Sequence, residues 1–432
     1  MKEDIDLENL QNRYDDMLLL YNNKDYNQLL IKSKEFCKDY PKNILGFNVL
    51  ALAYKNTGKI EKAKELYERL VEANSDNVSI YVNAGNLFYS LGNINKAIEC
   101  HLKGLNIDSK NVGALNGLGL AYFNKGDVDS AIDYYTQVLE VDSTQTYANF
   151  NMANCLRQKK LNIEAATHYS KHFSKISQAQ ELECYYKLGD LKKFDEASKV
   201  FLERFGHTPL LATLSAHASV IYSRKDLLNF CPNPFDYIKK SNIFNDGHNQ
   251  DLINNFVADF NNLGITKKEQ SLLKNGFQSS GNIFMQEIES VQTIKKIIIE
   301  KIDEYKNKYL KVNPGLISDW PKNYTLYGWL ILINNQGHLE PHVHKEGWLS
   351  GSLYINIPEK LSDDSGSIKF SLDGGIYPKK NHDFPEKIVN LETGDIVLFP
   401  SSIFHSTIPF SSKKNRITLA FDVRPKDLEE VR

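Results

Sequence analysis

The chain has 432 residues, of which 41% are hydrophobic and 25% are charged, and its formal net charge at pH 7 is -2. This composition can fill the cores of two or three domains, so it excludes a disordered chain, and the near-zero charge excludes a globally basic nucleic-acid-binding protein. The chain has no apolar run of the ~20 residues that span a membrane, no secretory signal, and five scattered cysteines without a CxxC pair, so we expect a reduced, cytoplasmic protein with no nucleic-acid or membrane partner.

A 34-residue repeat is clearest over residues 44–179. It is visible in three residue series, listed by position: Gly58, Gly92 and Gly126; Ala63, Ala97, Ala131 and Ala165; Tyr67, His101, Tyr135 and Tyr169. Apolar residues within each unit recur at three- and four-residue intervals, which predicts two amphipathic helices, and each glycine is placed to end the first of them. Neither helix can bury its apolar face alone, so the units are predicted to stack into an α-solenoid.

The period and the residue pattern resemble the tetratricopeptide repeat. The first helix of a unit carries the pattern seen in Phe47, Leu50, Ala51 and Tyr54, where a small residue allows close helix packing. We expect helical repeats over residues 10–225, and the resemblance implies a protein or peptide partner. Five asparagines occupy positions that line the groove of this family and are candidates for contacting a peptide backbone, unless they are ordinary solvated residues: Asn83, Asn86, Asn116, Asn151 and Asn154.

The sequence pattern changes at about residue 226. Pro232 and Pro234 interrupt helical structure, and a helical pattern returns over residues 284–310. Short β-rich runs separated by turn signals then predict strands over residues 324–334, 349–357, 367–372, 395–400 and 416–423. A helix followed by many short strands predicts a second domain over 226–432, a β-sandwich or jelly roll with flanking helices.

This second domain contains a candidate metal site and a candidate anion site. His342 and His344 are two residues apart, so on a strand both imidazoles would project to one face and share a metal. His405 follows the apolar run 396–400. Arg416 lies in an apolar strand with Thr418 two positions later, and a buried guanidinium requires an anionic partner. That partner is either a ligand carboxylate or an internal one, with Asp395 and Asp422 as the candidates.

In this order, the residues resemble a bacterial and phage branch of the 2-oxoglutarate/Fe(II)-dependent oxygenases. The resemblance rests on these segments: Asn233-Pro234-Phe235-Asp236-Tyr237, Pro341-His342-Val343-His344, Leu349–Ile355, Gly394–Ser401, His405 and Arg416-Ile417-Thr418. It implies a double-stranded β-helix that binds Fe(II) through His342, His344 and His405. It also implies that Arg416, Thr418 and Tyr354 hold 2-oxoglutarate, whose oxidative decarboxylation is coupled through dioxygen to hydroxylation of a second substrate.

The metal-binding pattern has one departure from the commonest facial triad, which carries a carboxylate at its middle position. Here that position is His344, and an alternative ligand set consists of His344, Glu346 and His405. Our hypothesis is a dioxygenase that hydroxylates a protein or peptide recruited by the solenoid. The alternative is a non-catalytic scaffold or adaptor with a degenerate oxygenase-like barrel.

Overall fold

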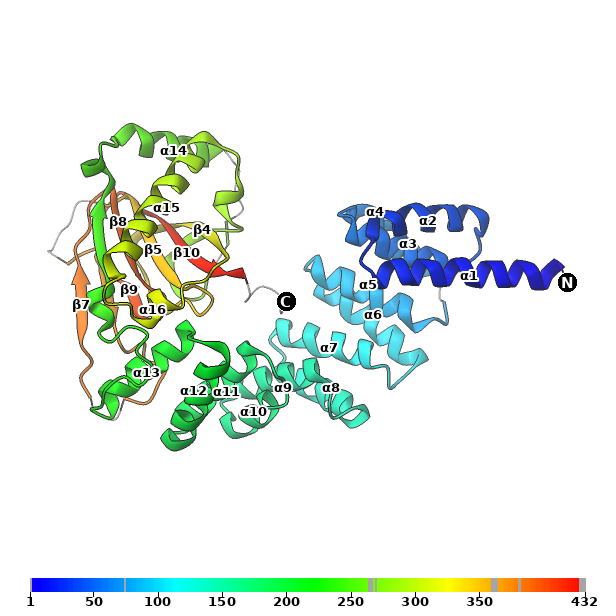
Figure 1. Ribbon diagram of the computed structural model, residues 1–432. Helices are drawn as coiled ribbons and strands as arrows, with labels where there is room; N and C mark the ends of the chain where they lie inside the picture. The colour runs from blue at the N-terminus through cyan, green and yellow to red at the C-terminus, as the bar shows by residue number, and fades with distance from the viewer. Residues whose placement is uncertain are drawn as a thin grey trace. The chain divides into compact units, whose positions relative to one another are not determined.

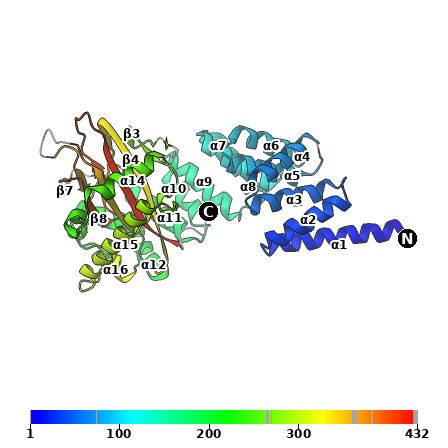
Figure 2. The ribbon, with the colours of Figure 1, turned by 90° about the horizontal axis from the view of Figure 1, so that it is seen from above.

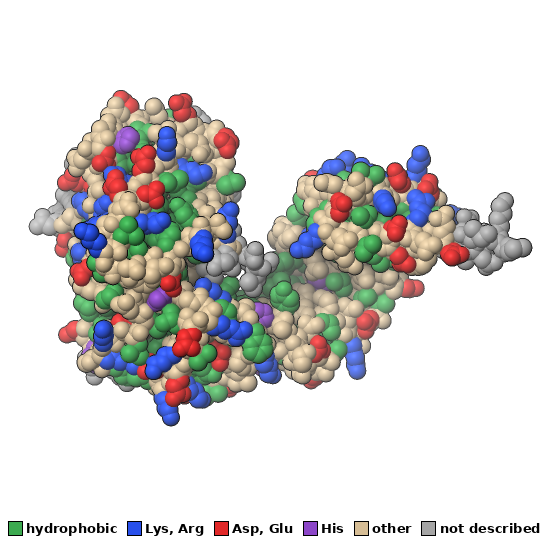
Figure 3. All heavy atoms as spheres, viewed as in Figure 1, with side chains coloured by type: hydrophobic (Ala, Val, Ile, Leu, Met, Phe, Trp, Pro, Cys, Tyr) green, Lys and Arg blue, Asp and Glu red, His purple; other side chains and the backbone are tan. Residues whose placement is uncertain are grey.

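The computed structural model describes residues 2–73, 75–262, 267–268, 270–358, 364–379 and 382–426. Their contacts divide the chain into two compact units, Met1–Ser177 and Gln178–Arg432. Within the described ranges, no helix is both long enough and apolar enough to cross a membrane. On the face drawn in Figure 3, basic and acidic side chains are interspersed over both units, as the small net charge leads one to expect.

The first unit is built from helices that follow one another closely along the chain (Figure 1). They are α1 (Lys2–Asn22), α2 (Tyr26–Asp39), α3 (Ile44–Asn56), α4 (Ile60–Glu72), α5 (Val78–Ser90), α6 (Ile94–Ile107), α7 (Val112–Lys125), α8 (Val128–Val141), α9 (Thr146–Gln158) and α10 (Asn162–Tyr169). Buried residues of consecutive pairs share one apolar cluster, for example Ala63 and Tyr67 of α4 with Ala84 of α5 and Ala97 of α6. The predicted tetratricopeptide solenoid is therefore confirmed.

The first helix of each pair ends in a left-handed residue. Gly58, Gly92 and Gly126 have φ values of +74°, +76° and +88°. Lys24 and Lys160 occupy the same position one period earlier and one period later, with φ values of +59° and +62°. The same turn geometry thus runs through five units, although at its two ends lysine takes the place of glycine, so the sequence pattern alone does not reveal it.

Small residues make room for the large ring of each unit. His101 is only 1% exposed, and a Cβ atom at either Gly85 or Gly117 would collide with its imidazole. The equivalent rings of Tyr67, Tyr135 and Tyr169 are fully buried. Burial lowers the pKa of His101 to about 4, so this imidazole is neutral in the folded chain at pH 7.

The second unit begins with three helices and continues as two antiparallel sheets with further helices. The helices are α11 (Lys175–Lys187), which spans the boundary, α12 (Leu191–Phe205), α13 (Pro209–Ile221), α14 (Gln250–Asn262), α15 (Glu289–Tyr309) and α16 (Gly315–Ser318), with 3-10 turns at Pro234–Tyr237, Ile243–Asp246 and Ile283–Met285. The strands are β1 (Lys239–Asn242), β2 (Lys267–Lys268), β3 (Leu273–Ser279), β4 (Tyr324–Leu339), β5 (Leu349–Asn356), β6 (Ile368–Ser371), β7 (Glu386–Val389), β8 (Asp395–Pro400), β9 (Phe404–Thr407) and β10 (Arg416–Pro425).

The sheets have the order β1-β8-β5-β10-β4-β3-β2 and β7-β6-β9, which agrees with the predicted jelly roll. All five predicted strands are present, although β4 is longer than expected. The short strands β1, β2, β3, β7 and β9 were not predicted, because runs of two to seven residues carry little hydrophobic periodicity. The 13-residue helix α14 was also not predicted.

One face of the large sheet is covered by helices, and the other face lines the interior of the jelly roll. Figures 1 and 2 show α14 and α15 beside this sheet. Ile298 and Ile302 of α15 share the main apolar core with Leu419 and Phe421 of β10. Because side chains alternate along a strand, the even-numbered residues of β10, from Arg416 to Arg424, lie on the opposite face.

The compact units meet 48 residues earlier than the predicted domain boundary between residues 225 and 226 (225 minus 177). Leu182 of α11, Tyr186 of α11 and Leu214 of α13 share an apolar cluster with Tyr377 and Phe404 from the β-rich region. The predicted boundary marked the end of the helical pattern, whereas packing joins these last helices to the sheets. The predicted end of the domain at residue 432 lies outside the described residues.

Candidate metal and cosubstrate site

Two neighbouring segments carry the three histidines. His342 and His344 were expected on a strand, but they lie in the extended segment that follows β4, where Pro341 supplies no N–H to continue the strand. His342 forms an isolated antiparallel bridge with His405 of β9, with N···O distances of 3.1 and 3.0 Å. The amide of His344 donates to the carbonyl of Ser401 at 3.1 Å. Backbone pairing therefore brings together histidines that are 61 residues apart in the sequence (405 minus 344).

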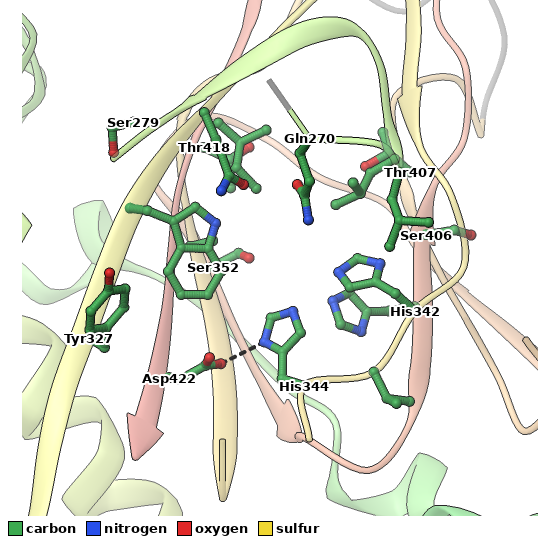
Figure 4. Close-up of a pocket in the computed structure, with 18 of the residues that line it drawn as sticks. Gln270, Ser279, Tyr327, His342, His344, Ser352, Ser406, Thr407, Thr418 and Asp422 are labelled. Carbon is green, nitrogen blue, oxygen red and sulfur yellow. Dashed lines mark hydrogen bonds and ion pairs between the residues drawn. The ribbon is translucent and has the colours of Figure 1, made fainter. Parts of the chain in front are cut away.

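The three imidazoles form a group that can hold one metal ion. One potential ligand atom from each of His342, His344 and His405 lies within 4.8 Å of the others. Figure 4 shows the rings of His342 and His344 facing the same cavity. The ring centroids of His342 and His405 are 4.3 Å apart, and those of His344 and His405 are 4.9 Å apart.

Hydrogen bonds at the second ring nitrogen orient each imidazole. Nδ1 of His342 contacts the carbonyl of Glu340 at 2.8 Å. Nδ1 of His344 contacts Oδ1 of Asp422 at 2.6 Å, and Nδ1 of His405 contacts the carbonyl of Ile403 at 3.3 Å. Because these oxygens accept and do not donate when the carboxylate is ionised, each Nδ1 is the donor, and in a neutral ring the lone pair is then on Nε2.

Burial keeps two of these imidazoles neutral. It lowers the pKa of His342 to about 4 and holds the pKa of His405 well below its ordinary value, and the neighbouring imidazoles add to both effects. A neutral imidazole is the form that binds a metal. The donor set, its protonation and its orientation therefore all fit a divalent transition metal with histidine ligands.

Asp422 is the carboxylate that orients His344. Its side chain is buried, and Oδ1 also accepts a hydrogen bond of 2.8 Å from the hydroxyl of Ser350. Burial acts to raise the pKa of Asp422, but His344 and Arg424 outweigh it and the pKa is lowered. We had considered Asp422 only as a partner of Arg416. The even number of residues between Arg416 and Asp422 along β10 is the sequence signal that could have placed both side chains on one face of the strand.

Arg416 is buried in the same cavity, with 3% of its surface exposed. Its Nε atom donates to the carbonyl of Gly366 at 3.2 Å, and Nη1 donates to the hydroxyl of Thr418 at 2.9 Å. The guanidinium carbon lies 5.1 Å from the centroid of the Tyr354 ring, which is also buried. Among the described residues, no carboxylate oxygen lies within 4.0 Å of this guanidinium.

The two internal carboxylates that we had considered for Arg416 have other partners. Asp395 pairs with Lys240 at 2.8 Å, and Asp422 pairs with His344. Burial lowers the pKa of Arg416, which reflects the cost of holding this charge away from water. The cavity thus contains a cation whose counter-charge the described part of the chain does not supply.

The cavity that contains these groups has a volume of about 560 Å³. At its wall, the guanidinium carbon of Arg424 lies 3.9 Å from the centroid of the Tyr327 ring. Glu346, the alternative metal ligand, pairs with Arg424 at 3.4 Å and is not a member of the imidazole group. The cavity has room for a small dicarboxylate beside the histidines.

Gln270 is one of several polar residues of the cavity that sequence reasoning missed. Figure 4 shows its amide pointing inward above the histidines. This residue precedes β3, in a region where the sequence carries no recognisable motif. Tertiary structure alone brings it to the site.

The five asparagines of the predicted peptide groove remain candidates. Asn83 donates to Asn48 at 3.2 Å, and Asn154 accepts a hydrogen bond from the Tyr169 hydroxyl at 2.7 Å. Asn86 is exposed, and Asn116 and Asn151 are half-buried. Asn83 and Asn151 occupy equivalent positions two periods apart, as do Asn86 and Asn154. Part of this set therefore contributes to internal hydrogen bonds.

Several solved structures are similar to part of the chain. They include that of Pseudomonas aeruginosa PilF, with 14% identity over 47% of this chain and 95% of that chain and a TM-score of 0.43. The type IV pilus biogenesis factor PilW has 18% identity over 48% and 97%, with a TM-score of 0.43. YrrB, a tetratricopeptide-repeat protein described as having an unusual peptide-binding site, has 16% identity over 41% and 95%, with a TM-score of 0.37.

Family models match both parts of the chain. Tetratricopeptide-repeat models match residues 46–77, 85–126 and 112–145, and the model described as "Putative 2OG-Fe(II) oxygenase" matches residues 327–422. No curated protein has a significantly similar sequence. The second match includes all three histidines, Arg416 and Asp422. The chain therefore joins tetratricopeptide repeats to a domain that is similar to this 2OG-Fe(II) oxygenase family.

Proposed function

We propose that the protein is an Fe(II)- and 2-oxoglutarate-dependent dioxygenase that hydroxylates a protein or peptide substrate. One observation carries this proposal: three imidazoles that can share a metal ion line a cavity with a buried guanidinium that has no carboxylate partner among the described residues. A metal and a dicarboxylate together complete both halves of this cavity. The family match over residues 327–422 supports the same pair of ligands.

Each predicted site residue has a role in this proposal. His342, His344 and His405 hold Fe(II) and leave positions for 2-oxoglutarate and dioxygen. When bound, the metal and the cosubstrate supply the chemistry that converts 2-oxoglutarate and dioxygen to succinate and carbon dioxide and hydroxylates a C–H bond. Arg416 holds the distal carboxylate of 2-oxoglutarate through charge-assisted hydrogen bonds, with Thr418 beside it.

Tyr354 and Asp422 support the two ligands. Burial raises the pKa of Tyr354, so its phenol remains a hydrogen-bond donor for the same carboxylate. Asp422 holds the ring of His344 with its proton on Nδ1, as carboxylates behind metal-bound histidines do. Glu346, already paired with Arg424, is not required as a ligand.

The repeats supply the argument for a macromolecular substrate. Tetratricopeptide units generally bind proteins or peptides, and a recruiting surface on the same chain raises the effective concentration of its client near the metal. The five groove asparagines are the residues proposed to contact the peptide backbone. A small free metabolite would gain nothing from this arrangement.

The test is production of succinate by the full chain with Fe(II), ascorbate and 2-oxoglutarate, with candidate peptides supplied. We expect His405→Ala to abolish succinate formation. His338→Ala is the matched control, because His338 lies on β4 and pairs with Glu340 outside the imidazole group. Equal succinate from wild type and His405→Ala, together with no stoichiometric iron in the wild type, would favour the scaffold alternative.

A further inference from the structure

We propose that Glu183 of α11 is a positioning residue of the metal site and acts through Lys345. This inference rests on the proposed function, because it concerns the segment that carries two of the proposed iron ligands. Glu183 is 162 residues from Lys345 in the sequence. The helices that end the repeat region would accordingly be part of the metal centre.

Glu183 is a fully buried carboxylate surrounded by donors. Its two oxygens each accept a hydrogen bond of 3.1 Å from Nζ of Lys345. Oε1 also accepts from the hydroxyl of Tyr377 at 3.0 Å and pairs with Lys187 at 3.3 Å. A buried carboxylate with this many donors has a single favourable position, so it can fix the position of Lys345.

Lys345 directly follows a proposed metal ligand. Residues 342–344 are extended, so their side chains alternate between two sides, and Lys345 begins the turn that follows. His342 and His344 turn toward the other imidazoles, whereas Val343 packs against the apolar cluster of α11–α13 and Lys345 reaches Glu183. The helices therefore contact this segment at the two residues that flank His344, Val343 and Lys345.

The segment that carries the third histidine is held by the same helices. The hydroxyl of Thr213, on α13, donates to the carbonyl of Ser402 at 2.7 Å, and both residues are buried. Phe404, next to His405, belongs to the apolar cluster of α11–α13. One group of helices thus contacts both backbone segments that carry proposed ligands, and Glu183 supplies the charged contact.

Loss of this contact should act on metal binding more than on stability alone. In Glu183→Gln the shape of the side chain is kept, but two lysines lose their buried counter-charge. Lys345 would then move toward water and displace His344 from the group. Glu183→Asp retains the charge and is a second variant if the first does not fold.

The experiment measures Co(II) binding to the full-length chain by visible spectroscopy, below the melting temperature of every variant. The control is Asp195→Asn, which breaks the ion pair with Arg224 at 2.5 and 2.8 Å in the same helical region without touching either ligand segment. We expect Glu183→Gln to weaken Co(II) binding at least about tenfold, while Asp195→Asn stays within twofold of wild type. In a double-mutant cycle with Lys345→Met, the two effects should not add.

A second readout needs no metal. In histidine-labelled apo protein, the ring resonances of His344 should shift in Glu183→Gln and stay unchanged in Asp195→Asn. Equal Co(II) affinities in the two variants, additive effects in the cycle, or an unchanged His344 ring would overturn the inference. This test does not measure succinate. A wild type that binds Co(II) without making succinate would contradict the proposed function, whereas the role of Glu183 would still be decided by Co(II) affinity and the His344 ring resonances.

Discussion

Replacing Arg416 by methionine should separate cosubstrate binding from folding. A guanidinium has five N–H donors; two of them bond to Gly366 and Thr418 and one can bond to the Tyr354 hydroxyl, which leaves two for a ligand carboxylate. Two charge-assisted hydrogen bonds, each contributing about 1.5–3 kcal/mol, correspond to roughly a 10²- to 10⁴-fold change in affinity. We therefore expect Arg416→Met to weaken 2-oxoglutarate binding by that factor.

The same substitution should not destabilise the ligand-free protein. A buried charge without a counter-charge is costly, and methionine is an apolar side chain that can occupy the same space. We expect a melting temperature without 2-oxoglutarate at or above that of wild type, and loss of the increase that 2-oxoglutarate produces in wild type.

The assay is thermal unfolding of the Mn(II)-loaded chain, without dioxygen, over a series of 2-oxoglutarate concentrations. Arg224→Met is the matched control, since this guanidinium pairs with Asp195 of α12 and does not line the cavity. A dissociation constant for Arg416→Met within threefold of wild type would refute the assignment of Arg416 to the carboxylate.

Three further predictions concern other parts of the chain. His101 has a pKa of about 4 in the folded chain and 6.5 in the unfolded chain, so the free energy of unfolding of the repeats should fall by up to ~3 kcal/mol as the pH falls from 6.5 to 4. In urea unfolding at pH 7 and 4.5, His101→Tyr should lose less stability than wild type, and an equal loss would contradict the burial argument. Lys160→Gly should raise the unfolding free energy by about 1 kcal/mol, because its left-handed backbone suits glycine as at Gly126, and a lower urea midpoint would exclude this reasoning. Asp422→Asn should weaken Co(II) binding by roughly 10- to 100-fold. The control is Asp395→Asn, because buried Asp395 pairs with Lys240 away from the histidines and its loss should leave Co(II) binding unchanged. Equal Co(II) affinities in the two variants would show that Asp422 does not orient His344.

Local pattern was sufficient for the elements whose residues repeat or alternate. The 34-residue series predicted the solenoid, and the left-handed glycines at 58, 92 and 126 are in the structure as expected. The five predicted strands are also present, because each is an apolar run bounded by turn residues. The left-handed turns at Lys24 and Lys160 were not predicted, because lysine is not the residue that this backbone conformation favours.

The grouping of His342, His344 and His405 was predictable only through the ordered motif, because nothing local indicates that residue 405 lies beside residue 342. The sequence by itself determined the two kinds of architecture and the residue types of the site, since periodicity and side-chain chemistry are properties of neighbouring residues. Tertiary structure alone decided that Asp422 faces His344, that Arg416 has no carboxylate partner within the described ranges, and that Glu183 of α11 contacts Lys345 in the ligand segment. These contacts join residues far apart in the chain, where backbone pairing and core packing, and not local preference, determine which side chains meet.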